Sequence, residues 1–255
     1  MMLNMIETGV DSDRPPVLLA HGLFGSGRNL GGLARRLGES RRVISVDMRN
    51  HGDSFHDSDH GYPALAADLA EVIAARGGTA DVLGHSMGGK AAMVLALTRP
   101  ETVRRLVVMD IAPFAYDHSQ TELIDAMQAV DLSGLHLRSE ADARLAEQVA
   151  DPGVRAFLLQ SLDLKAQPAR WKLNLAALRD QMPLITGWPE MPKAVFPGPA
   201  LFLAGADSDY CGPAQLRAIR EYFPEAQIRI VEGAAHWLHA DRPVEVAEAV
   251  ARFLD

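Results

Sequence analysis

The sequence predicts an α/β fold with a mostly parallel sheet and an inserted helical cap, on three observations. Short apolar runs alternate with helix-length segments early in the chain, which is typical of parallel strands joined by crossover helices. From about residue 114 only helical periodicity is found, and the alternation returns after about residue 190. We therefore expect a core of residues 1–113 and 190–255 and a cap of residues 114–189.

Six apolar runs, each bounded by turn-forming residues, are the expected strands. They are residues 17–21, 43–47, 80–86, 106–112, 200–205 and 226–232. The expected cap helices are residues 121–130, 140–150, 154–162 and 170–180, and the expected late core helices are 212–223 and 244–254. A proline-rich passage, residues 182–199, ends the cap, because proline lacks an N–H and breaks helices. No strand is expected inside the cap.

Composition excludes several classes of protein. A chain of 255 residues, 48% of them hydrophobic, can bury a full core. Its net charge of −8 argues against nucleic-acid and anionic-membrane partners, which need clustered Lys and Arg. The single cysteine, Cys211, forbids an internal disulfide, and the amino terminus lacks the basic start and apolar run of a signal peptide. We expect a soluble cytoplasmic protein.

The stretch GHSMGGKA, residues 84–91, fits two motifs with incompatible chemistry. As a phosphate-binding P-loop it has Gly84, Gly89 and Lys90 at the required spacing. Ala91, however, stands where the P-loop needs a hydroxyl to bind magnesium. A P-loop ATPase therefore stays an alternative with one feature missing.

As a nucleophile elbow, the same stretch presents Ser86 on a sharp turn between a strand and a helix. Gly84 and Gly88 are needed because side chains there would collide with the neighbouring strand or helix. Attack on an acyl carbonyl also needs two N–H donors for the developing oxyanion. We assign these to Leu23, in the small-residue loop after the first expected strand, and to Met87, which follows the serine.

A histidine base should follow the serine in the chain. His236 lies between the last expected strand and the last helix, where a loop at the carboxyl edge of the sheet can reach the elbow. His239, one helical turn later, is the fallback. His21 and His85 precede the serine and are expected to pack or hydrogen-bond locally.

The carboxylate has two candidate places. In the usual place, three residues past Gly205, stands Ser208, flanked by Asp207 and Asp209. Asp110 ends the strand after the elbow helix, at the same edge of the sheet, and is our first candidate for the acid. Whether Asp207 or Asp209 shares that role stays open.

The loop GSGRNL, residues 25–30, has a rival interpretation as a dinucleotide-binding turn, with Asp47 as the ribose-binding acid. Leu30 occupies the position of the third glycine. This departure makes the dinucleotide-binding interpretation weaker than the nucleophile-elbow interpretation, in which this part of the chain carries an oxyanion donor.

Several separated motifs, taken in order, resemble one family. HGLFGS, VDMRNHGDS, LGHSMGGK, DIAP, GWP and GAAHWLHAD resemble the YbfF-like branch of the α/β-hydrolase superfamily, over about residues 3–254. The resemblance implies an α/β-hydrolase fold and a serine esterase acting on acyl esters and acyl-CoA thioesters, with a small helical cap. It also implies that Asp110 is the acid and that Ser208 stands at the customary acid position.

The expected mechanism is acyl transfer. Ser86 attacks the acyl carbonyl, His236 takes its proton, and Asp110 orients the imidazole. The Leu23 and Met87 amides bind the oxyanion, and Ser208 is expected to add a hydrogen bond near the acid or the imidazole. No metal or organic cofactor is required for these steps. Alternatives are a non-hydrolytic enzyme on the same scaffold, such as a cofactor-free haloperoxidase or a lyase, the P-loop ATPase, and a non-catalytic binding module.

Apolar residues of the cap are candidates for the lining of an acyl pocket. They are Met127, Phe157, Leu158, Leu159, Trp171 and Leu175. For any one of them, burial of the cap against the core is the favoured interpretation. The acyl chain length, the preference for ester or thioester and the oligomeric state are therefore left open.

Overall fold

A seven-stranded sheet forms the centre of the computed structural model, which describes residues 1–191 and 194–255. The strand order is β1-β3-β2-β4-β5-β8-β9, and every neighbouring pair is parallel except β1 with β3. The strands are β1 (Met5–Gly9), β2 (Val17–Ala20), β3 (Arg42–Val46), β4 (Ala80–His85), β5 (Val103–Met109), β8 (Ala200–Gly205) and β9 (Gln227–Val231). The six predicted strands are present. β1 is not among them, because its half-exposed sequence MIETG has no apolar run.

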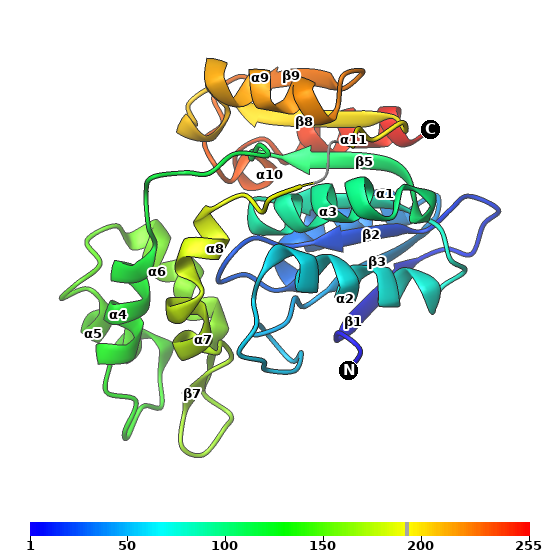
Figure 1. Cartoon of the computed structure of the whole chain (residues 1–255). Helices are drawn as coiled ribbons and strands as arrows, with labels where there is room; N and C mark the ends of the chain where they lie inside the picture. Colours follow the sequence, from blue (N-terminus) through cyan, green and yellow to red (C-terminus); the bar gives the residue numbers. More distant parts are fainter. Residues whose placement is uncertain (192–193) are drawn as a thin grey trace.

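Helices cover both faces of this sheet (Figure 1). One face is covered by α2 (Tyr62–Ala74), α3 (Met87–Thr98) and α9 (Pro213–Tyr222), and the other by α1 (Gly31–Gly38), α10 (Leu238–Asp241) and α11 (Pro243–Leu254). Successive residues of a strand point to opposite faces, so the central strands must be apolar throughout. In β4, for example, Val82 packs with the first group of helices and Leu83 with the second.

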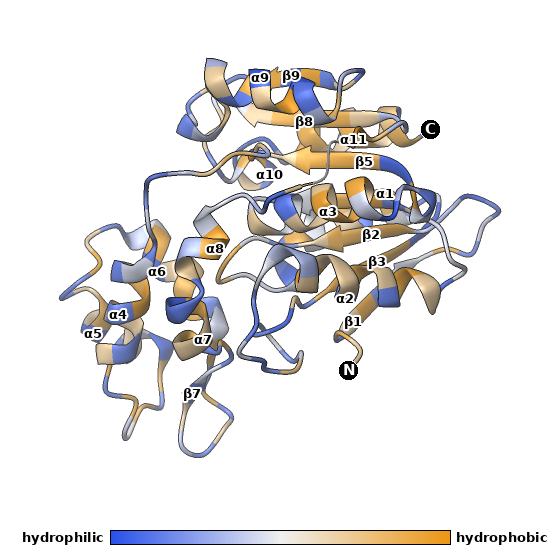
Figure 2. Ribbon diagram, in the orientation of Figure 1, coloured by the Kyte–Doolittle hydropathy of each residue, from blue (hydrophilic) through white to orange (hydrophobic). Residues whose placement is uncertain are grey.

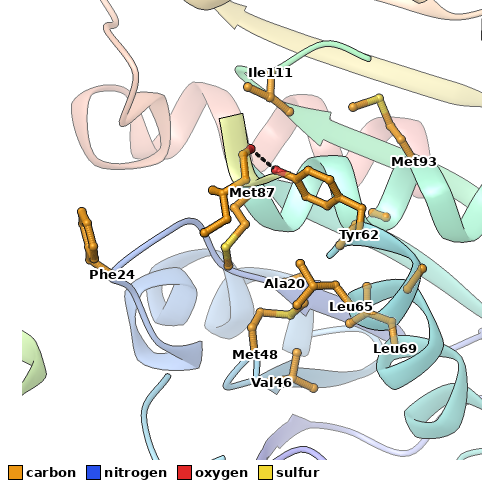
Figure 3. Close-up of a cluster of buried hydrophobic side chains, with 14 of the residues drawn as sticks. Ala20, Phe24, Val46, Met48, Tyr62, Leu65, Leu69, Met87, Met93 and Ile111 are labelled. Atoms are coloured by element: carbon orange, nitrogen blue, oxygen red, sulfur yellow. Dashed lines mark hydrogen bonds between the residues drawn. The ribbon is translucent and has the colours of Figure 1, made fainter. Parts of the chain in front are cut away.

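The interior is therefore two apolar layers, one on each side of the sheet. Figure 2 shows the apolar colour concentrated on the central strands and on the inner sides of the helices. Figure 3 shows part of the first layer, where Leu65 and Leu69 of α2 lie beside Val46 of β3 and Ala20 of β2. Full burial of a leucine side chain contributes about 1.5–3 kcal/mol. These layers make the sheet a rigid support for the loops at its carboxyl edge.

A separate lobe lies beyond the carboxyl ends of the strands (Figure 1). Its helices are α4 (Thr121–Ala129), α5 (Arg138–Leu145), α6 (Pro152–Leu158), α7 (Leu175–Asp180) and α8 (Met182–Thr186). All of them come from the chain between β5 and β8, as an inserted cap requires. We propose residues 114–189 as this cap and residues 1–113 with 190–255 as the core.

The prediction that the cap has no strand is wrong. β6 (Leu162–Asp163) and β7 (Arg170–Trp171) form a short antiparallel pair. The helix predicted over residues 170–180 begins only at Leu175, because the Asn174 side chain accepts the Ala177 N–H and caps it there. The residues before Asn174 are free to extend.

The proline-rich passage, residues 182–199, also differs from the prediction at its start. Residues 182–186 form α8, with Pro183 in the first turn, where a missing N–H costs nothing. Pro192 and Lys193 of this passage lie outside the described residues. Within residues 1–191 and 194–255, no helix combines the length and apolar character needed to cross a bilayer.

Candidate active site

Ser86 stands on a tight turn between β4 and α3. Its φ of 52° lies in the left-handed region, which costs a residue with a side chain about 1–3 kcal/mol. A Cβ at Gly84 would lie 2.2 Å from the Gly88 carbonyl oxygen, and one at Gly88 would lie 2.4 Å from the Ala20 carbonyl oxygen. Glycine is therefore required at both positions, as the elbow motif predicts. The turn places the serine side chain at the carboxyl edge of the sheet.

Three predicted residues form a continuous hydrogen-bonded chain. His236 Nε2 lies 3.1 Å from Ser86 Oγ, and His236 Nδ1 lies 2.8 Å from Asp110 Oδ2. Asp110 is fully buried at the end of β5, and its other oxygen accepts the Gly205 N–H at 2.9 Å. A carboxylate can only accept, so the proton of a neutral His236 belongs on Nδ1. Nε2 is then free to accept the serine proton.

Ser208 also joins this chain, through the acid. Its hydroxyl donates to Asp110 Oδ2 at 2.5 Å, so this carboxylate oxygen is bonded to both Ser208 and His236. Asp207 and Asp209 are exposed, and neither has a hydrogen bond to His236 among the described residues. The structure thus brings Asp110 to the histidine and Ser208 to Asp110, and it leaves the two flanking aspartates outside.

The two predicted oxyanion donors face the same cavity as Ser86. Met87 is the first residue of α3, so its N–H has no partner within the helix. In the part of the chain that the structure describes, neither the Leu23 nor the Met87 N–H has a protein acceptor. The next residue, Phe24, has a φ of 65°, so the loop turns sharply directly after Leu23.

Two buried histidines hold the Leu23 loop in place. His21 Nε2 accepts the Met48 N–H at 2.9 Å, and its Nδ1 lies 2.7 Å from the Gly22 carbonyl oxygen. His51 Nε2 accepts the Phe24 N–H at 3.2 Å. Burial lowers the pKa of both imidazoles, which keeps them neutral and able to accept. His51 stands in the HGDS motif, and its role in holding this loop was not predicted from the sequence.

Lys90 does not face a phosphate site. Its side chain is 1% exposed, and Nζ donates to the carbonyl oxygens of Thr186 at 2.8 Å and Gly187 at 2.6 Å, where α8 ends. Tyr62 donates to the preceding carbonyl, that of Ile185, at 2.6 Å (Figure 3). Burial lowers the pKa of Lys90 to about 7. Lys90 therefore ties the end of the cap to the core, which argues against the P-loop alternative.

The carboxylate of Asp47 likewise makes its hydrogen bonds within the protein. Its carboxylate accepts the N–H groups of Gly27 at 2.8 Å and Asp53 at 2.9 Å, and the amide of Asn4 at 2.9 Å. It is buried, so no face is left for a ribose. This arrangement argues against the dinucleotide alternative.

A cavity of about 300 Å³ opens above Ser86, between the core and the cap. Of the six candidate cap residues, Phe157 and Leu158 line it. The other four pack in the apolar interior, which is the interpretation favoured for any one of them from the sequence: Met127, Leu159, Trp171 and Leu175. Trp171, for example, donates from its indole to the Met127 carbonyl, away from the cavity. Other apolar residues that line it include Leu123, Val154 and Ile185 of the cap and Ile111 of the core. Helical periodicity shows that a helix has an apolar face, not which partner that face meets.

The model of the alpha/beta hydrolase family matches residues 17–249. The chain belongs to this family. It is 41% identical to the sn-1-specific diacylglycerol lipase ABHD11 of Mus musculus, over 96% of this chain and 82% of the relative. It is 39% identical to Esterase YbfF of Escherichia coli strain K12, over 94% of this chain and 93% of the relative. A solved structure described as a marine microorganism esterase matches with a TM-score of 0.94 and 33% identity, covering 99% of both chains.

These matches confirm two predictions for this α/β hydrolase. The fold is the α/β-hydrolase fold, and relatives with the names esterase and lipase support carboxylic ester hydrolysis as the class of reaction. They do not favour the non-hydrolytic and ATPase alternatives. The roles of individual residues rest on the geometry described above.

Proposed function

We propose that the protein is a serine hydrolase that cleaves small-molecule acyl esters through an acyl-enzyme on Ser86. The observation that carries the proposal is the hydrogen-bonded chain from Ser86 through His236 to the buried Asp110. Ser86 Oγ attacks the acyl carbon while His236 Nε2 accepts the hydroxyl proton. Asp110 stabilises the imidazolium that forms and holds its Nδ1–H in place. Ser208 holds the carboxylate of Asp110 in turn.

The tetrahedral intermediate carries a negative oxygen that needs donors. The Leu23 and Met87 N–H groups supply them, and the amino terminus of α3 adds its positive dipole end. His236 then protonates the leaving oxygen, the C–O bond breaks, and the acyl group stays on Ser86. Water, deprotonated by the same imidazole, attacks the acyl-enzyme, and the carboxylic acid and Ser86 are released.

The cavity lining supports an apolar acyl group. Its walls include Phe157 and Leu158 from the cap and Ile111 from the core. We extend the substrate class to acyl-CoA thioesters, because the same attack and the same oxyanion donors serve a thiol leaving group. The relative from Mus musculus is named for diacylglycerol, which is also an acyl ester with apolar chains. A cytoplasmic location is part of the proposal, since one cysteine in 255 residues fits a reducing compartment.

Intact-mass analysis after treatment with a fluorophosphonate tests the nucleophile. We expect a single adduct on the wild type, none on Ser86→Ala, and slow labelling of His236→Ala and Asp110→Asn. Ser133→Ala, an exposed serine in the cap, is the matched control and should be labelled like the wild type. No adduct on folded wild-type protein would overturn the proposal. Hydrolysis rates on aryl esters and acyl-CoAs in parallel distinguish ester from thioester preference.

A further inference from the structure

The imidazole of His236 lies close to two other rings. The ring of Tyr210 stacks on it with centroids 4.1 Å apart and planes 20° from parallel. The ring of His85 is tilted by 42° to it, with the two centroids 4.8 Å apart. Tyr210 comes from the short loop between β8 and α9 that also carries Ser208. No step of the mechanism above uses Tyr210.

We propose that Tyr210 is a positioning residue that holds the His236 imidazole against Asp110 and favours its protonated form by stacking. This inference rests on the proposed function, since it assumes that His236 is the base. An aromatic face carries negative charge density and attracts a cation placed over it. During the reaction, His236 becomes a cation when it takes the proton of Ser86. The stack is therefore stronger in the transition state than in the resting enzyme, which is the condition for a gain in rate.

Tyr210 is fixed at both of its ends. The Tyr116 hydroxyl donates to the Tyr210 carbonyl oxygen at 2.7 Å and accepts the Ala112 N–H at 3.0 Å. The Tyr210 hydroxyl lies 2.8 Å from His118 Nε2. Tyr116 and His118 belong to the segment that leads from β5 into the cap. The stacking ring is thus held by the connection between core and cap.

The other groups around His236 leave this stack undisturbed. The titratable groups that face the imidazole are Asp110, His85, His239, Tyr210 and His118. Burial lowers the pKa of His85 well below its usual range, and that of His239 to about 4, so neither opposes the imidazolium near neutral pH. Burial also raises the pKa of Tyr210, which keeps its ring a neutral phenol.

The test compares Tyr210→Leu, which removes the ring, with Tyr210→Phe, which keeps it. We expect Tyr210→Leu to lose roughly three- to tenfold in kcat, with KM nearly constant, from the usual strength of an aromatic pair. In the dependence of kcat/KM on pH, the acidic limb reports protonation of the base. In Tyr210→Leu this limb should move to lower pH, because the imidazolium has lost its stacking partner. Tyr210→Phe should stay within about twofold of the wild type and restore the position of the limb.

A matched control removes an aromatic ring elsewhere. Tyr222→Leu, on α9, takes away a ring that packs on Trp188 and does not line the cavity, so it should leave the pH profile unchanged. If Tyr210→Leu is poorly folded, Tyr116→Phe removes the bond to the Tyr210 carbonyl and should shift the limb in the same direction. An unmoved limb in the folded variants, or a change in KM alone, would show that Tyr210 is only a wall of the cavity. The fluorophosphonate adduct of the wild type is measured separately. A failure of the proposed function, which would remove this adduct, is therefore distinguishable from a failure of the role proposed for Tyr210, which would not.

Discussion

Asp110 Oδ2 lies 2.8 Å from His236 Nδ1, although 126 residues separate the two in the chain. Asp110 directly follows β5, and His236 follows β9 at the same carboxyl edge of the sheet. The contact is possible because β8, which pairs with both strands, is the only strand between them in the described sheet. This relationship between two loops is the basis of the first prediction.

Asp110→Asn should lower kcat for ester hydrolysis by roughly 10³- to 10⁴-fold, as loss of a triad carboxylate does in serine proteases. An amide can donate toward Nδ1, which favours the wrong tautomer and removes the negative charge that stabilises the imidazolium. Steady-state kinetics on an aryl ester measures the loss. Asp209→Asn, on the exposed neighbouring loop, is the control and should stay within about twofold. Equal losses in the two variants would contradict the assignment of the acid.

Ser208→Ala should lower kcat by roughly tenfold or more, with KM little changed, because hydrogen bonds to charged groups contribute about 1.5–3 kcal/mol. The variant leaves Asp110 Oδ2 with one partner in place of two. Ser208→Thr, which keeps the hydroxyl, should recover much of the rate. Wild-type kinetics for Ser208→Ala would mean that this serine only caps the turn at Asp209–Cys211.

Gly88→Ala should destabilise the protein, because its Cβ would lie 2.4 Å from the Ala20 carbonyl oxygen. Overpacking of this kind costs about 1–3 kcal/mol, or roughly 2–4 °C in Tm for each kcal/mol in a chain of this size. Gly32→Ala in α1 is the matched control, since nothing lies within 4 Å of its added methyl. It should be neutral or stabilising by up to about 1 kcal/mol. Calorimetry on both variants checks the sign of each change.

Lys90→Met should loosen the end of the cap more than the core. It leaves the half-buried Thr186 and Gly187 carbonyls without their donor, at a cost of up to about 1–3 kcal/mol for each, the range for a fully buried group. Removal of a buried ammonium group offsets part of this loss in global stability. Hydrogen exchange over residues 182–189 should therefore rise while Tm changes little. Lys165→Met, an exposed lysine of the cap, should leave exchange there unchanged.

Stability should fall as the pH drops below about 6.5. Burial lowers the pKa of His60 to about 3 and that of His239 to about 4, and it also lowers the pKa of His21, His51 and His85. Between these values and 6.5 the unfolded chain binds more protons than the folded one, so unfolding becomes more favourable as the pH decreases. Each unit of pKa shift corresponds to about 1.4 kcal/mol.

Urea titrations at pH 7.5, 6.0 and 5.0 measure this dependence. His60→Asn removes one of the buried imidazoles, so its unfolding free energy should fall less steeply over the same range. Carboxylates titrate in the wild type and in His60→Asn alike. Their contribution to the change of unfolding free energy with pH therefore cancels when the two proteins are compared. A variant with the slope of the wild type would contradict the role of His60.

Much of the candidate site could be predicted because it depends on local patterns and on strand order. Ser86 follows from the glycines around it, which serve a turn of a few residues. Asp110 and His236 follow from their places after strands, since the carboxyl ends of parallel strands meet at one edge. The exposed β1 and the short strands of the cap lack such a pattern and were missed.

The amino-acid sequence by itself determined the alternation of strands and helices, the elbow and the order of nucleophile, acid and base. These features depend only on hydrophobic periodicity and on the spacing of residues along the chain. Only the tertiary structure decided that Ser208 bonds the acid and not the imidazole, that neither flanking aspartate shares the role of Asp110, and which cap residues face the cavity. It also decided that Tyr210 stacks on His236. Such contacts depend on how loops and helices far apart in the chain are oriented in space, which no local pattern specifies.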